Sequence, residues 1–356
     1  MSERNDLPRQ QALVGGALRL LLTTLLPILV TLVLAGLLLA ALGVDATTYF
    51  AYVVERGLFT RLGVEQSLTR MAPLLLLAAS LIVAFRAGIW NLGVDGQSLL
   101  AAVAAAAVAP PLASLWPGSV TLLAGLVLAA LVGALWALLP ALLRAYQGVN
   151  EIITTLMMTF LGTSLANAVI KLALLDPATT VPQTRTLPVE ERLPRLLDTT
   201  VSSGLLIAMA VVVVMHLVLT RTAFGLRLRV LGINPRAALH AGLPVPRLIV
   251  AALLLSGALA GLAGAVEVLG VQGNVRADWN PAYGLLVVPL VFLARLNGLA
   301  ASVFVFLFAV LSIGGESAAR RLGVPHDVHL VMVAVLLVTS ALAERLARRL
   351  ARDLGV

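Results

Sequence analysis

The chain has 356 residues, of which 60% are hydrophobic and 12% are charged, and its mean hydropathy is +1.02. Soluble proteins average about 45–50% apolar and about 25% charged residues, so this composition excludes an ordinary soluble domain and indicates an integral membrane protein. The net charge is +8, and excess arginine in a membrane protein usually marks cytoplasmic loops, so no nucleic-acid partner is expected. The absence of cysteine excludes disulfides, thiolate metal sites and a cysteine nucleophile.

Apolar runs separated by short polar segments follow one another along the chain. A bilayer is crossed by a helix of about 20 residues, and a helix satisfies its own backbone groups in lipid. The first run is too long for the apolar region of a signal peptide, which has roughly 7–15 residues. We therefore expect an all-α polytopic protein with about ten transmembrane helices, at 17–42, 71–88, 98–115, 119–142, 152–174, 201–220, 247–270, 283–296, 298–314 and 328–344. The eighth and ninth of these are short.

An even number of spans places both termini on one side of the membrane. With the N-terminus inside, most arginines fall in inner loops and in the tail, as the positive-inside rule requires. The sequence thus predicts one transmembrane domain over 1–356, with cytoplasmic segments at 1–16, 221–246 and 345–356. The polar segment 175–200 then lies outside.

The inner loop 221–246 carries the signals of a short capped helix. Asn234 suits an N-cap and Pro235 the first helical position. Gly242 follows as a C-cap, and two prolines directly after it oppose any continuation. The loop is therefore expected to present a small basic helix over 236–241, either as a docking surface or as a solvated basic loop.

The same loop contains a Phe-Gly pair, two arginines, a Gly-x-Asn-Pro, an Ala-Ala and an Ala-Gly, at Phe224–Gly225, Arg227, Arg229, Gly232–Pro235, Ala237–Ala238 and Ala241–Gly242. This pattern resembles the coupling segment in permease subunits of ABC importers for branched-chain amino acids, simple sugars and nucleosides. The resemblance covers roughly 70–345. It implies that an ATPase subunit contacts this segment, through Arg229, Asn234, Pro235, Arg236, Ala238, His240 and Gly242.

Two further segments resemble the nucleoside-type branch of that family. Asn91–Gln97 is similar to the Asn-x-Gly-x-Glu-Gly-Gln of those permeases, with Asp95 in place of the Glu. Gly148–Met157 is similar to their Gly-x-Asn-Glu-x-Ile-x-Thr segment. The aspartate keeps the charge of the family's glutamate but shortens its reach.

Polar residues within or beside the apolar runs are candidates for a solute pathway. Gly93 and Gly96 relax the backbone, and Asp95 and Gln97 are able to cap the following helix. Irregular backbone at membrane depth lines a cavity or packs within protein, although a plain cytoplasmic turn and simple interhelical hydrogen bonding are the alternatives. The candidate pathway residues are Asn91, Asp95, Gln97, Asn150, Glu151, Thr154, Thr155, Asn167 and Glu267. Glycines at 257, 261 and 264 are expected to pack helices closely.

The resemblance implies a vitamin B12-type importer permease fold with two inverted five-helix halves, in a bacterial or archaeal inner membrane. It implies a second similar permease subunit, ATPase subunits and a substrate-binding lipoprotein or periplasmic protein. The chain has no P-loop motif, so ATP and Mg²⁺ are expected on the ATPase, with no cofactor, metal or catalytic residue here. The expected solute is small and polar, a nucleoside first, with a simple sugar or branched-chain amino acid as alternatives. An ion-coupled secondary transporter is the rival and requires paired buried acids, for which Asp95 and Glu267 are the candidates.

Overall fold

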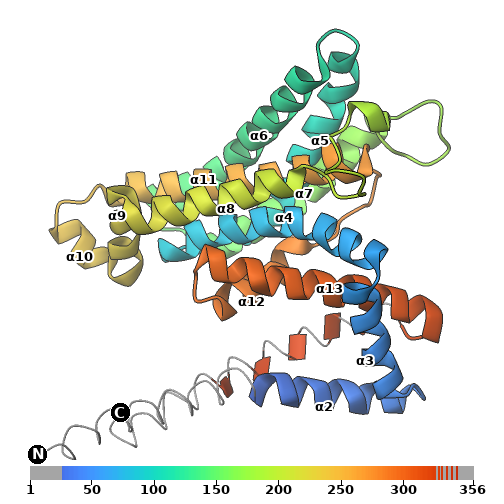
Figure 1. Cartoon of the computed structure of the whole chain (residues 1–356). Helices are drawn as coiled ribbons and strands as arrows, with labels where there is room; N and C mark the ends of the chain where they lie inside the picture. Colours follow the sequence, from blue (N-terminus) through green and yellow to red (C-terminus); the bar gives the residue numbers. More distant parts are fainter. Residues whose placement is uncertain are drawn as a thin grey trace, which may run out of the picture. The chain divides into compact units, whose positions relative to one another are not determined.

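A computed structural model describes residues 26–325 and scattered positions between 328 and 343. This part of the chain is predominantly helical (Figure 1), and its extended pairing is limited to isolated bridges. The prediction of an all-α protein is confirmed. The helices are α2 (Leu26–Ala41), α3 (Ala46–Val54), α4 (Arg61–Arg86), α5 (Val94–Ala113), α6 (Gly118–Gln147), α7 (Glu151–Leu172), α8 (Gly204–Arg221), α9 (Ala223–Ile233), α10 (Pro235–His240), α11 (Val245–Glu267), α12 (Tyr283–Leu293) and α13 (Gly298–Leu322).

Within the described residues, 7 helices are long and apolar enough to cross a membrane: α4, α5, α6, α7, α8, α11 with the π-helical turn η4 (Val268–Gln272), and α13. A further pair, Leu29–Ala41 with Ala46–Phe59, is bent by 119° and gives up to 8 if it counts as one span. The predicted span 283–296 corresponds to the shorter α12, and 328–344 lies mostly outside the described residues. The number of ten stays a prediction.

The N-terminal side of the fold differs from the sequence expectation in two ways. α4 begins at Arg61 instead of at 71, and α3, with the π-helical turn Glu55–Phe59 after it, was not predicted. Charged residues in the first turns of α4 lower the local hydropathy, so this part of the helix did not stand out as an apolar run. One of them, Glu65, is buried because its carboxylate accepts hydrogen bonds from the Thr200 N–H (2.9 Å) and hydroxyl (2.8 Å).

The chain divides into two compact units, one comprising Met1–Val64 with Val310–Val356 and the other Glu65–Ala309. In the first, α2, α3 and the end of α13 share an apolar cluster that includes Leu39, Tyr49 and Ala318. The expectation of a single transmembrane domain stays a prediction.

The core of the second unit is built on close contacts of α11 with α5 and α6. A Cβ atom on Gly261 would meet the carbonyl oxygen of Ala129 in α6, and one on Gly264 would meet that of Ser98 in α5. Small residues let helix backbones approach in this way. The interpretation of these glycines as packing positions is confirmed.

An extended segment between α7 and α8 pairs with the segment that leads into α12. The Thr184 N–H donates to the Val275 carbonyl (3.0 Å) and the Leu187 N–H to that of Gly273 (2.8 Å). The Arg192 guanidinium donates to the carbonyls of Leu187 and Val271, both at 2.9 Å. These bonds hold the segment that leads into α12, of which residues 279–281 line the pocket described below.

Candidate functional site

The connection from α4 to α5, residues 87–93, is non-helical and lies within the second unit. Because it bonds to residues of α7 and α11, we call it the re-entrant segment. Near its start, Gly88 has φ +72° and touches the backbone of Gly232 in α9. Further on, Asn91 donates to the Ser256 hydroxyl at 2.9 Å. Ser256 lies about 16 Å along α11 from its first residue, at 1.5 Å per residue. The segment therefore passes from the last turn of α9 to the middle of α11.

Asn91 is fully buried, and its side chain uses its full hydrogen-bonding capacity inside the protein. Its amide donates to the Gln97 carbonyl (3.0 Å) and to Ser256, while its oxygen accepts from the Gly93 N–H (3.1 Å) and the Gln97 amide (3.2 Å). An asparagine amide has two donors and two acceptor positions. Ser80 of α4 extends this network by donating to the Ser256 carbonyl at 2.7 Å.

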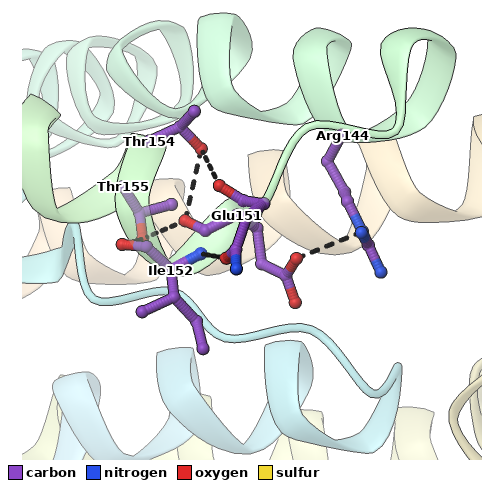
Figure 2. Close-up of polar contacts among 6 residues, drawn as sticks. Arg144, Glu151, Ile152, Thr154 and Thr155 are labelled. Carbon is purple, nitrogen blue, oxygen red and sulfur yellow. Dashed lines mark hydrogen bonds and ion pairs between the residues drawn. The ribbon is translucent and has the colours of Figure 1, made fainter.

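Two threonines of α7 satisfy the backbone of the re-entrant segment. The Leu92 N–H donates to the Thr155 hydroxyl (3.1 Å), and the Thr159 hydroxyl donates to the Leu92 carbonyl (2.9 Å). Thr155 also donates to the Glu151 carbonyl at 2.6 Å (Figure 2). The predicted pathway residues Asn91, Gln97 and Thr155 thus belong to one buried network that holds non-helical backbone among the helices. Backbone polar groups that water cannot reach need such partners within the protein.

The start of α5 differs from the capping expectation. Gly93 occupies the N-cap position and makes no side-chain cap, while Asp95 lies in the first turn. The Asp95 carboxylate accepts instead from the Gly284 N–H at the start of α12, at 2.6 Å. Gly96 lies inside α5, where a Cβ would meet the backbone of Thr159. Prediction of Asp95 and Gln97 as caps was wrong, because the Asp95 side chain bonds to Gly284 and the Gln97 side chain bonds to Asn91.

Asp95 and Glu267 line one pocket, the acidic pocket, although they are far apart in sequence. Both are buried, with exposures of 7% and 6%. The pocket is small, about 20 Å³, which is room for roughly one water molecule. Its other polar and aromatic lining residues are Ser98, Trp279, Asn280 and Tyr283. None of these four residues was predicted, because no local pattern in the sequence joins them to either acid.

Glu267 accepts a hydrogen bond from the Gln272 amide at 3.0 Å. Asn167, another predicted pathway residue, does not line the acidic pocket. Its oxygen accepts from the Asp278 N–H at 2.8 Å, next to an exposed ion pair of Asp278 with Lys171 (2.9 Å). Asn167 therefore anchors the segment that leads toward Trp279.

The turn from α6 to α7 holds the remaining predicted pathway residues. Asn150 caps α7 by accepting from the Ile152 N–H at 2.9 Å. The buried Glu151 carboxylate pairs with Arg144 at 3.2 Å, and the Thr154 hydroxyl bonds the carbonyls of Asn150 and Glu151, both at 3.2 Å (Figure 2). These contacts fix the turn from which Thr155 reaches the re-entrant segment.

The predicted helix in the loop 221–246 is present as α10, Pro235–His240. The Asn234 oxygen accepts from the N–H groups of Arg236 (3.0 Å) and Ala237 (3.1 Å), and Gly242 has φ +75° beyond the helix end. The predicted N-cap and the proline at the first helical position are confirmed, whereas the C-cap is Ala241 and Gly242 follows it directly. Ala238 is fully buried, whereas Leu239 is 63% exposed. Arg229, Arg236 and His240 are exposed as well.

The family described as branched-chain amino acid transport system / permease component matches residues 63–341. The chain belongs to this family. It is 34% identical over 340 residues to the glucose ABC transporter permease protein TsgB13 of Haloferax volcanii, covering 91% of this chain and 88% of that protein. It is 28% identical over 328 residues to the guanosine ABC transporter permease protein NupP of Bacillus subtilis, covering 89% and 92%.

A third relative is the nucleoside ABC transporter permease protein NupB of Lactococcus lactis, 27% identical over 333 residues, with 90% of each chain covered. The chain is accordingly a multi-pass membrane component of an ABC transporter. It is a transport subunit and not an enzyme. Membership of this family implies ATPase and substrate-binding partners. It therefore favours an ABC permease over the alternative of an ion-coupled transporter, although Asp95 and Glu267 do line one pocket.

Two neighbouring threonines test the role of the buried network. Thr155→Val leaves the Leu92 N–H without its partner, and an unsatisfied buried donor costs about 1–3 kcal/mol. Thr154→Val removes only bonds within the first turn of α7. We expect Thr155→Val to lower the thermal unfolding temperature of the purified protein in detergent, with Thr154→Val close to wild type. Equal unfolding temperatures for the two variants would contradict the assignment.

Proposed function

We propose that the chain is the inner-membrane permease subunit of an ABC importer that carries a hydroxyl-rich neutral solute, a nucleoside or a simple sugar, into the cytoplasm. The observation that carries this proposal is the acidic pocket. Carboxylates accept hydrogen bonds from hydroxyl groups, and charged acceptors form the stronger bonds. Aromatic side chains such as Trp279 and Tyr283 add apolar surface for a sugar ring or a nucleobase. Relatives named for guanosine and for glucose support this solute class.

The size of the acidic pocket supports transport by alternating access. Its volume of about 20 Å³ holds roughly one water molecule, so a solute enters only when the surrounding helices separate. The pocket is lined by α4, α5, α11 and the segment before α12. Sites of this kind in transporters lie beside discontinuous helices, and the re-entrant segment supplies such a break directly before Asp95.

We further infer a vitamin B12-type permease fold with inverted halves and with both termini cytoplasmic. In this orientation α9 and α10 lie inside and 175–200 outside. A second similar permease subunit completes the translocation unit, and ATPase subunits hold ATP and Mg²⁺. A lipoprotein or periplasmic protein delivers the solute. The basic, exposed character of the loop 221–246 supports this orientation.

Within this assembly α10 is the proposed contact for the ATPase. Leu239 presents an apolar side chain that is 63% exposed on a capped helix, with Arg236 and His240 exposed beside it. Ala238, which the sequence placed among the contact residues, is buried within the chain. Because Ala238 is buried, the exposed residues of α10 are the ones that test docking.

The orientation is testable because the chain has no cysteine. A cysteine in place of the exposed Thr186 should react with a membrane-impermeant maleimide in intact cells. One in place of Ala351, which lies outside the described residues, should react only after permeabilisation. The reverse labelling would contradict the proposed orientation.

Docking through α10 predicts that Leu239→Asp abolishes uptake and solute-stimulated ATP hydrolysis together while membrane insertion is unchanged. Loss of a central apolar contact costs about 2 kcal/mol or more, roughly thirtyfold in affinity. Arg236→Glu should act in the same direction. Leu197→Asp is the control, because Leu197 is an exposed leucine in the proposed outer loop. Normal co-purification of the ATPase with Leu239→Asp would count against docking at α10.

Solute recognition predicts that Asp95→Asn and Glu267→Gln each raise the KM for uptake by about tenfold, since a hydrogen bond to a charged group contributes about 1.5–3 kcal/mol. Uptake of radiolabelled guanosine and of glucose, per inserted complex, measures this effect and identifies the solute. Glu65→Gln is the matched control, a buried acid bonded to Thr200 outside the pocket lining. Unchanged KM values in both pocket variants would remove the acidic pocket from the pathway.

A further inference from the structure

The start of α10 is joined to the end of α9 by a single residue, Asn234. The Asn234 N–H donates to the Val230 carbonyl and closes α9, while the Asn234 side chain caps α10 through the N–H groups of Arg236 and Ala237. One residue therefore belongs to both helices, and no flexible linker separates them. A displacement of α10 is passed to the last turn of α9, which contains Gly232.

Gly232 rests directly on the backbone where α4 ends and the re-entrant segment begins. A Cβ atom on Gly232 would meet the Arg86 carbonyl oxygen and lie 2.9 Å from the Gly88 nitrogen. A Cβ atom on Gly88 would lie 3.0 Å from the Gly232 Cα and 3.1 Å from its oxygen. The two backbones meet without an intervening side chain, so the contact has none of the compliance that side-chain rotamers provide.

Arg86, which precedes this contact, ties the same point to two other elements. Its guanidinium donates to the Leu219 carbonyl in the last turn of α8 (3.2 Å) and to the Leu296 carbonyl between α12 and α13 (3.1 and 3.3 Å). Carbonyls at a helix C-terminus lack intrahelical partners and accept such bonds. Arg86 thereby holds together the ends of α4 and α8 and the turn after α12, at the point where Gly232 of α9 contacts the backbone.

We propose that the Gly232–Gly88 contact is the joint through which α10 moves the re-entrant segment. This inference rests on the proposed function and assigns Gly88 and Gly232 as positioning residues. Three residues beyond Gly88, Asn91 links the segment to α5 through Gln97 and to α11 through Ser256. Asp95 follows in the first turn of α5 and lines the acidic pocket. Movement of α10 is thus delivered to the pocket along a continuous path of backbone contacts and saturated hydrogen bonds.

The test is coupling between ATP hydrolysis and uptake in the complete importer reconstituted in proteoliposomes. Gly232→Ala and Gly88→Ala should each hydrolyse ATP while the guanosine or glucose imported per ATP falls by about tenfold, within the usual range of coupling between sites. Gly148→Ala is the control for Gly88, because Gly148 has φ +66° with open space around it. Gly36→Ala is the control for Gly232, because the nearest atom to its added methyl is the Ala46 Cβ at an ordinary 3.7 Å.

Wild-type solute per ATP in both joint variants would overturn the proposal. A wild-type complex that imports neither solute with ATP would instead contradict the proposed function, so the two failures are distinguishable. If the joint variants do not assemble, spin-label distances in the otherwise unaltered chain decide. A Leu239→Cys and Trp90→Cys pair should keep its separation when ATP binds, while a Leu239→Cys and Leu135→Cys pair changes. An equal change in both pairs would show that α10 moves independently of the segment.

Discussion

The hydrogen bonding of the Leu92 backbone is the constraint on which the second unit depends. A chain that leaves the helical conformation among apolar helices exposes N–H and carbonyl groups that have no water to bind, each at a cost of several kcal/mol. Thr155 and Thr159 supply the missing partners from α7, one for the N–H and one for the carbonyl. With these bonds in place, α5 can begin at Val94 beside the middle of α11.

Close approach of the helices makes that arrangement possible. Gly261 and Gly264 let the backbone of α11 lie directly against α6 and α5, so Ser256 comes within reach of Asn91. The glycines and the polar network have complementary roles. The glycines shorten the distance between the helix backbones, and the hydrogen bonds of the network fix how the re-entrant segment is aligned along α11. A fully satisfied network of this kind rigidifies the elements that it joins.

Local patterns in the sequence predicted the local features well. Asn234, Pro235 and Gly242 specified the ends of α10, because caps depend on residues only a few positions apart. Apolar runs likewise located most of the long helices. The start of α4 was missed because Glu65 is made acceptable by Thr200, which is distant in the sequence. For the same reason the meeting of Asp95, Glu267 and Trp279 at one pocket could not be read from any of their neighbourhoods.

As the proposed solute site, the acidic pocket would also act as a filter on charge. Carboxylates that accept hydrogen bonds from hydroxyl groups repel phosphate oxygens, and such like-charge contacts exclude unwanted ligands. An unphosphorylated solute would pass, while its phosphate ester would be rejected from either side. A kinase acting on the imported solute would then convert it to a form that this route cannot return. The position of Asp95 and Glu267 would in that way let the cell retain phosphorylated products of the solute behind a pathway that remains open to the solute itself.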